Sequence, residues 1–275
     1  MAKGAGKAYH ELAMTYEVYA VRYAHHDRPA RENFLDNDPH EGRGPLDYFV
    51  WAIIGAGKTY VVDTGFGEAE AKARGRQLLR TPAEGLRLIG IDPAKVEDVI
   101  LTHMHYDHAG SLDLFPNARF HIQDKELRYV TGRFMTHRTL RGSFALADVE
   151  GMVRRVYQDR VRFHDGDVEL APGLSLHFIG GHTMGLQSVR VLTRRGQVVI
   201  ASDAAHLYAH LDEERAFPTV FHVGDMLEGH RTLRRLADSE RHIVPGHDPL
   251  VLRRYPAASP ELDGVIVRLD AEPRA

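Results

Sequence analysis

The chain has 275 residues, 43% of them hydrophobic, and a net charge of −3, the balance of a folded protein with one large domain or two small ones. It contains no cysteine, which excludes disulfides, thiolate metal ligands and cysteine nucleophiles. No run of about 18 apolar residues predicts a membrane span, and no basic tract predicts nucleic-acid binding. The N-terminus lacks the apolar core of a signal peptide, so we expect a cytoplasmic protein without membrane contacts.

The predicted strands begin after an N-terminal arm. We expect residues 1–15 to form this loose arm and residues 16–275 to form a single domain. Short segments with alternating or β-branched apolar residues predict strands at 16–23, 47–54, 59–63, 96–101, 118–122, 162–170, 174–179, 187–192, 196–200 and 240–245. In the strand at 118–122, His121 is expected to face the surface.

Helices and one long loop are predicted between these strands. The polar stretch 27–45 predicts a loop that is either disordered or functional. Helix-forming residues predominate at 68–89, where Gly75 and Pro82 break the pattern, and at 124–160, with an interruption around Gly142-Ser143. An outer helix is predicted at 231–236, and a further helix is expected to open at Ala109-Gly110. The segment 124–160 contains three side chains that either line a substrate pocket or pack an inserted helical region: Met135, Phe144 and Leu146.

A dense cluster of metal-ligand side chains follows the buried strand at 96–101. His103, His105, Asp107 and His108 occupy four of six consecutive positions there. Two histidines at i and i+2 of an extended segment point to the same side, and the following carboxylate and imidazole can turn back towards them. Histidine is common in this chain, with 18 in total, but this spacing after a buried strand predicts a metal site.

Three further ligand-type residues, His182, Asp203 and His247, come directly after later predicted strands. Chemistry in sheet proteins collects at the carboxyl ends of strands, so we expect them to join the first cluster. Five imidazoles and two carboxylates are too many for one tetrahedral zinc and suit two metal ions, with Asp203 as the natural bridge. Asp63 also ends a strand and is either a turn residue or a hydrogen-bond partner of a ligating imidazole.

These motifs resemble the landmarks of the metallo-β-lactamase superfamily. The matching stretches are His103-x-His105-x-Asp107-His108, Asp63-Thr64-Gly65, Gly181-His182-Thr183, Asp203 and Gly246-His247-Asp248. Within the superfamily, the chain is most similar to the N-acyl homoserine lactonases and to relatives such as 4-pyridoxolactonase, over about residues 16 to 252. The resemblance implies an α/β fold, the αβ/βα sandwich, with two mixed β-sheets face to face, helices on the outer faces and metals at one edge between the sheets.

Two positions depart from the lactonase pattern. Those lactonases usually carry a tyrosine three residues after the bridging aspartate, where this chain has His206, and the nearest tyrosine is Tyr208. The family motif Gly-His-Thr-Pro-Gly-His has Met184 and Leu186 at two of its positions here. Both differences lie near the expected pocket and leave the metal ligands intact, so they bear on the substrate and not on the metal centre.

The resemblance implies a role for each site residue. One metal would be held by His103, His105 and His182, and the other by Asp107, His108 and His247, with Asp203 bridging the two. Two such ions would lower the pKa of a shared water from about 15.7 to near 7, and the hydroxide would attack a lactone carbonyl. Asp107 would carry the proton, and Tyr208 or His206 would donate a hydrogen bond to the oxyanion. We expect Zn²⁺, with Fe, Mn or Co as alternatives.

The expected function is therefore a dinuclear hydrolase that opens a small-molecule lactone, and a homodimer is expected by resemblance. A glyoxalase II-like thioesterase would use the same ligand types and differ only in its substrate. A mononuclear iron oxygenase would hold one metal and need oxygen, and a non-catalytic binding module would normally have lost some ligands. A β-lactamase would need an export signal, and a metallo-nuclease would need a basic surface.

Overall fold

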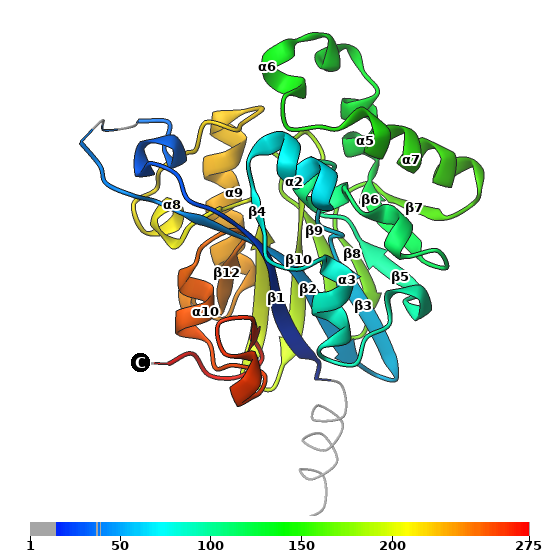
Figure 1. Ribbon diagram of the computed structural model, residues 1–275, viewed down its shortest axis with the longest axis vertical. Coiled ribbons are helices and arrows are strands. Elements are labelled where there is room, and N and C mark those ends of the chain that lie inside the picture. The colour runs from blue at the N-terminus through cyan, green and yellow to red at the C-terminus, as the bar shows by residue number, and fades with distance from the viewer. Residues whose placement is uncertain (1–14, 37, 39, 275) are drawn as a thin grey trace, which may run out of the picture.

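The computed structural model describes residues 15–36, 38 and 40–274 (Figure 1). The expected N-terminal arm, apart from Thr15, lies outside the described residues. Two β-sheets form the centre of the described part, and helices lie on their outer sides.

The larger sheet has eight strands in the order β13-β1-β2-β3-β5-β6-β7, with β4 paired to β1. Its strands are β1 (Glu17–His26), β2 (Leu46–Gly55), β3 (Lys58–Val62), β4 (Gln77–Leu78), β5 (Asp98–Ile100), β6 (Arg119–Gln123), β7 (Val161–His164) and β13 (Ile266–Arg268). The neighbours β3, β5, β6 and β7 run parallel to one another. Their carboxyl ends therefore lie at the same edge of the sheet.

The smaller sheet has five strands in the order β12-β11-β10-β9-β8. They are β8 (Val168–Ala171), β9 (Leu174–Phe178), β10 (Gln187–Thr193), β11 (Gly196–Ser202) and β12 (Ile243–Pro245). Strand β10 is antiparallel to both β9 and β11, and β11 is parallel to β12. The carboxyl ends of β9, β11 and β12 consequently share one edge as well.

Alternating side chains of the strands build a layered core. Trp51 of β2 and Leu176 of β9 belong to one buried cluster, which fills the space between the two sheets. The neighbouring residue Val50 points the other way and packs with Leu86 beneath the helices of the larger sheet. A third cluster joins the outer face of the smaller sheet to helix α9 (Val223–Leu236). These layers confirm the predicted αβ/βα sandwich.

The remaining helices are short and connect or cover the strands. They are α2 (Glu68–Arg74), α3 (Pro82–Arg87), α4 (Tyr106–Ala109), α5 (Asp124–Val130), α6 (Arg138–Arg141), α7 (Leu146–Tyr157), α8 (Tyr208–Asp212) and α10 (Leu250–Arg254), with 3-10 turns η1 (Ala30–Asn33), η2 (Pro93–Lys95), η3 (Leu112–Leu114), η4 (Arg133–Thr136), η5 (Glu240–His242) and η6 (Pro260–Leu262). Figure 1 shows α6 at the top of the view, on a projection away from the sheets. Within the described ranges, no helix has the length and apolar character needed to cross a bilayer.

Three predictions about local structure are wrong. The run 162–170 is not one strand, because a bend after His164 sends β7 into the larger sheet and β8 into the smaller one. The helix expected to open at Ala109-Gly110 is instead the single turn α4, which ends there. His121 is buried and not surface-facing, because its Nε2 lies 3.1 Å from Asp98 Oδ1 and its ring stacks on His164.

Candidate metal centre

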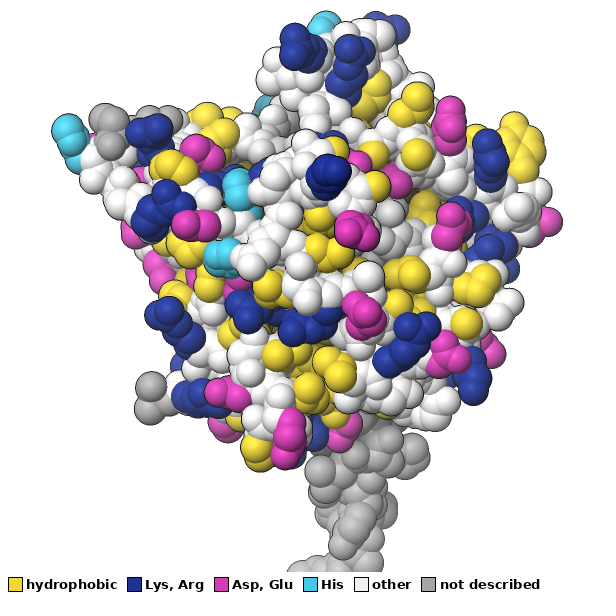
Figure 2. Space-filling model, in the orientation of Figure 1, with side chains coloured by type: hydrophobic (Ala, Val, Ile, Leu, Met, Phe, Trp, Pro, Cys, Tyr) yellow, Lys and Arg dark blue, Asp and Glu magenta, His cyan; other side chains and the backbone are white. Residues whose placement is uncertain are grey.

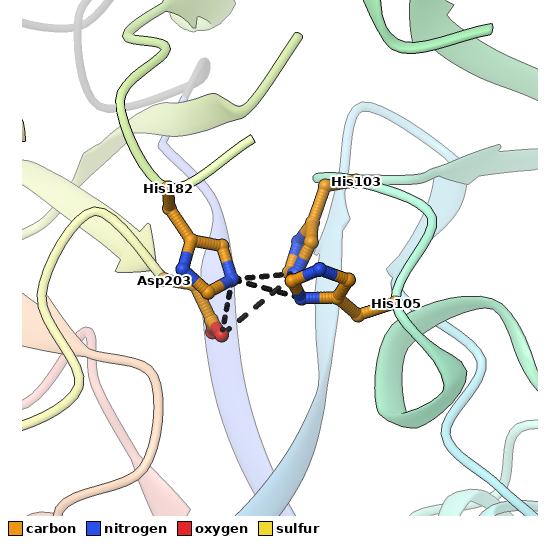
Figure 3. Close-up of side chains that lie close together, drawn as sticks. All are labelled: His103, His105, His182 and Asp203. Carbon is orange, nitrogen blue, oxygen red and sulfur yellow. Dashed lines mark hydrogen bonds and ion pairs between the residues drawn. The ribbon is translucent and has the colours of Figure 1, made fainter. Parts of the chain in front are cut away.

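One group of side chains brings together His103, His105, His182 and Asp203, which converge from loops of both sheets (Figure 3). His182 Nε2 lies 3.2 Å from His103 Nε2 and 2.9 Å from His105 Nδ1, and these last two atoms are 3.0 Å apart. Asp203 Oδ2 lies 3.2 Å from His182 Nε2 and 3.8 Å from His103 Nε2. The four donor atoms form a closed cage of the size of one cation.

A second group combines Asp107, His108 and His247 with the other oxygen of Asp203. Asp203 Oδ1 lies 3.2 Å from His108 Nε2 and 3.1 Å from His247 Nε2. Asp107 Oδ2 lies 3.6 Å and 3.7 Å from the same two nitrogens. Asp203 thus presents one oxygen to each group, as a carboxylate between two ions would.

The donor atoms fit two divalent cations. A tetrahedral ion with bonds of about 2.0–2.2 Å needs donor atoms roughly 3.3–3.6 Å apart, close to the spacings observed. His108 Nε2 and Asp203 Oδ1 are buried without a hydrogen-bond partner, and a cation would satisfy both. Burial holds the pKa of His103 and of His105 well below the usual range, so both rings are neutral, the form that binds metals.

The strand directions bring these residues to one place. His103, His182, Asp203 and His247 each follow the carboxyl end of a strand, respectively β5, β9, β11 and β12. A Cβ atom on Gly246 would lie 2.8 Å from the backbone carbon of Ser202 and 2.9 Å from Asp203 Oδ1. Only glycine therefore lets the His247 loop approach the Asp203 carboxylate this closely.

Hydrogen bonds on the far side of the rings fix their orientation. The pairs are His108 Nδ1 with Asp63 Oδ2 at 2.7 Å, His182 Nδ1 with the Thr219 carbonyl at 2.6 Å, and His247 Nδ1 with the Asp47 carbonyl at 3.0 Å. Asp63 also accepts a hydrogen bond from the Thr102 N–H at 2.8 Å. These contacts support the hydrogen-bonding alternative for Asp63, which orients an imidazole of the site.

Two residues at the site have a strained backbone. Asp63 and Ser202 have φ values of 62° and 49°, in the left-handed region that non-glycine residues rarely adopt. Asp63 follows β3 and contacts His108, whereas Ser202 ends β11 directly before Asp203 and its hydroxyl donates to Thr102 Oγ1 at 2.9 Å. Strain of this kind is typical of functional sites, where the surrounding structure holds it in place.

Glu126 is a site residue that the sequence analysis missed. This fully buried carboxylate accepts hydrogen bonds from the Met104 N–H at 2.9 Å, the Thr183 hydroxyl at 2.7 Å and the Gly185 N–H at 2.9 Å. It therefore ties the loop after β5 to the loop that carries His182. Its position just after β6, the strand beside β5, is the signal that could have identified it.

The three predicted catalytic residues occupy different surroundings. Asp107 lies among the metal-ligand side chains, as described above. His206 Nε2 lies 2.9 Å from Asp203 Oδ2, and its ring stacks on Phe217 with centroids 3.7 Å apart. The ring of Tyr208 instead belongs to the core between the sheets and lies under the Arg254 guanidinium, 3.7 Å from it. The structure thus brings His206 to the centre and packs the Tyr208 ring into the core.

Met135, Phe144 and Leu146 line a cavity of about 580 Å³ beside this centre. The ring of Phe144 lies edge-on to His105, with centroids 4.4 Å apart. Of the two alternatives left by the sequence, the geometry therefore favours a pocket wall over simple packing of an inserted segment.

The fold and the site define the superfamily. The family model of the metallo-beta-lactamase superfamily matches residues 43–247, which is most of the chain. The chain belongs to this superfamily.

Several similar proteins are named as lactonases. The N-acyl homoserine lactonase AttM of Azorhizobium caulinodans is 30% identical in an alignment of 177 residues, and the match covers 60% of this chain and 62% of that protein. The chain thus matches less than two thirds of this relative's length. A quorum-quenching N-acyl homoserine lactone lactonase superposes with a TM-score of 0.71 at 21% identity over 86% of this chain and 93% of that one. A probable metal-dependent hydrolase from Staphylococcus aureus reaches a TM-score of 0.73 at 14% identity over 96% of both chains.

Proposed function

We propose that this protein is a dinuclear metal-dependent hydrolase that opens the ring ester of a lactone, of the N-acyl homoserine lactone type or a related one. The observation that carries the proposal is the orientation of the Asp203 carboxylate, whose two oxygens face different groups of ligand-type residues. The names of the similar proteins support the substrate class. A site for two ions supports this function over a mononuclear oxygenase, and the complete ligand set supports it over a non-catalytic module.

We propose that one ion is held by His103, His105 and His182 and the other by Asp107, His108 and His247. Asp203 would contribute one oxygen to each ion. When bound, two divalent ions would lower the pKa of a shared water from about 15.7 to near 7 and polarise the lactone carbonyl. Zinc suits imidazole and carboxylate ligands, with iron, manganese or cobalt as alternatives. The homodimer and the cytoplasmic location stay predictions.

Asp107 is the residue that we propose for proton transfer. Hydrolysis adds water across the ring ester, so one proton must pass from the attacking water to the ring oxygen that leaves. Asp107 is 8% exposed, more than any of the other ligand-type residues, so its carboxylate is the ligand-type group most open to solvent. A carboxylate in that position can take the proton and return it to the leaving oxygen.

His206 is better suited to positioning than to oxyanion binding. A neutral imidazole has one N–H donor, and the Nε2 atom of His206 is engaged with Asp203. Its Nδ1 atom is buried without a partner and then carries only a lone pair. We therefore propose that His206 orients the bridging carboxylate, and that Tyr208, with its ring in the core, does not contact the substrate.

The test compares metal-loaded wild-type protein with Asp203→Ala. The substrates are N-hexanoyl homoserine lactone, an aromatic lactone, a glutathione thioester and a phosphodiester. We expect lactone opening by the wild type and a kcat/KM more than about 100-fold lower for the variant. This loss exceeds the roughly 10–100-fold that is typical when a residue that only hydrogen-bonds to a metal ligand is changed. Asp225→Ala, an exposed carboxylate on α9, is the matched control. Thioester turnover without lactone opening would instead support the thioesterase, and undiminished hydrolysis by Asp203→Ala would refute the dinuclear mechanism.

A further inference from the structure

Two half-buried arginines lie beside the metal centre, around Tyr106. Arg76, between α2 and β4, donates from Nε to the Tyr106 hydroxyl at 3.1 Å and from Nη1 to the Arg74 carbonyl at 2.8 Å. Arg28, just after β1, donates from Nε to Asn33 Oδ1 at 2.7 Å. Among the described residues, no hydrogen bond is made by Arg76 Nη2 or by Arg28 Nη1, so each guanidinium keeps a free donor group.

Neither arginine is paired with an acidic side chain. No carboxylate of the described ranges lies within 4.0 Å of Arg28 or Arg76, whereas neighbouring arginines are paired, Arg74 with Glu70 and Arg43 with Asp27. Burial lowers the pKa of the nearby His26 to about 4, and the charges of Arg76 and Arg28 act in the same direction. Charges withdrawn from water are normally paired. Two neighbouring guanidiniums without a carboxylate therefore indicate an anionic binding partner.

Tyr106 connects these arginines to the metal ligands. It stands between His105 and Asp107 in the sequence, and its hydroxyl lies 3.4 Å from that of Tyr48. The Tyr48 ring in turn lies edge-on to His247, with centroids 5.1 Å apart. The carboxylate of Asp107 faces His108 and His247, so it forms no ion pair with Arg76. Arg76 thus reaches the second group of ligands through Tyr106 without being neutralised by it, and Arg28 lies near Arg76 and the two tyrosines.

The surface beside this site is also basic. Residues 127–147, which include η4 and α6, contain four arginines and no acidic residue. Figure 2 shows Lys and Arg side chains on the projection at the top of the molecule. Arg74 joins the two regions, because it lies 3.9 Å from the Tyr106 ring centre and donates to the Gly142 carbonyl at 2.9 Å. Although Arg128 pairs with Asp124 at 3.9 Å, the other arginines of this segment add positive charge beside the site, which favours an anionic ligand.

We propose that Arg28 and Arg76 bind a carboxylate of the substrate, so that the preferred lactone carries a free carboxylate in addition to its ring ester. This inference rests on the proposed lactonase function and specifies its substrate class. Guanidinium groups suit the task because their planar donors match the two oxygens of a carboxylate. A neutral acyl chain would leave both arginines without an anionic partner.

A matched pair of lactones tests the proposal. N-hexanoyl and N-adipoyl homoserine lactone have acyl groups of equal carbon number, and only the second ends in a carboxylate. We expect the wild type to show a kcat/KM at least about tenfold higher for the adipoyl compound, as a charge-assisted hydrogen bond would give. Arg28→Gln and Arg76→Gln should each lower this ratio about tenfold. Arg80→Gln, which removes a half-buried guanidinium that bonds the Arg22 carbonyl, should leave it unchanged.

Equal kcat/KM values for both lactones in the wild type would overturn the proposal, as would a ratio that Arg28→Gln and Arg76→Gln leave unaltered. If neither lactone is opened, the proposed lactonase function is wrong, but this result does not test the carboxylate site. Calorimetry on the metal-loaded protein then tests whether the arginines bind a carboxylate. The probes are then the ring-opened products N-adipoyl and N-hexanoyl homoserine. Tighter binding of the adipoyl product, lost in Arg28→Gln, would support the carboxylate site, and equal binding of both products would overturn it.

Discussion

Replacing Glu126 by glutamine tests how the two ligand loops are held together. The carboxylate accepts from Met104 through Oε1, and from Thr183 and Gly185 through Oε2. The Glu126→Gln side chain has nearly the same shape, but one of its two oxygens becomes an NH₂ group. In either orientation this NH₂ group faces a backbone N–H, that of Met104 or that of Gly185, so at least one hydrogen bond is replaced by two opposed donors.

The magnitude follows from the number of bonds lost. A hydrogen bond to a charged group contributes about 1.5–3 kcal/mol, and the orientation that faces Met104 loses only one of the three. We therefore expect Glu126→Gln to lower the free energy of unfolding of the metal-free protein by about 2–3 kcal/mol. For a chain of this size, that loss corresponds to a fall of roughly 4–12 °C in the melting temperature. Denaturant titration followed by circular dichroism measures it directly.

Asp124→Asn is the matched control on the same helix. Asp124 forms only a loose, partly exposed pair with Arg128 at 3.9 Å, so its loss should change stability by less than about 0.5 kcal/mol. Equal stabilities of Glu126→Gln and wild type in the metal-free state would refute the role assigned to Glu126.

Three other changes probe the site and its surroundings. Asp63→Asn should weaken binding of one metal ion about 10–100-fold in chelator competition, and unchanged affinity would contradict an orienting role. Gly246→Ala should destabilise the protein by about 1–3 kcal/mol in denaturant titration, because its Cβ would crowd Ser202; no loss would contradict the close approach. Burial and Glu70 raise the pKa of Asp148 to about 7, so the contribution of Asp148 to stability should fall as pH rises from about 4 through 7. Asp148→Asn should therefore gain about 1 kcal/mol at pH 8 and nothing at pH 4, and equal gains at both would contradict the assignment.

The sequence predicts most of the fold and the ligand set for a physical reason. Alternating apolar residues mark strands such as β2 and β11, and the ligand-type residues sit at strand ends, where the chain direction alone decides which loops meet. The two-sheet arrangement itself came from the family resemblance. The sequence does not show that the two oxygens of Asp203 face different groups, because that depends on side-chain orientation.

Residues that act through long-range contacts were not predictable in the same way. Glu126 looks like any acidic residue in the first turn of a helix until its partners, up to 59 positions away in sequence, are known. The sequence does not reveal the bend between β7 and β8, because apolar residues alternate with polar ones on both sides of Asp165 and Asp167. The whole run therefore looks like one strand. Arg28 and Arg76 lie 48 positions apart (76 − 28), and only the fold shows that both are half-buried and near each other without an acid.

Elemental analysis of the metal-loaded protein tests the central claim most directly. The account predicts two equivalents of a divalent transition metal per wild-type chain, and one equivalent or fewer for Asp203→Ala, because Asp203 offers an oxygen to each group of ligands. One equivalent or less in the wild type, or two equivalents retained by Asp203→Ala, would contradict a metal centre bridged by this carboxylate.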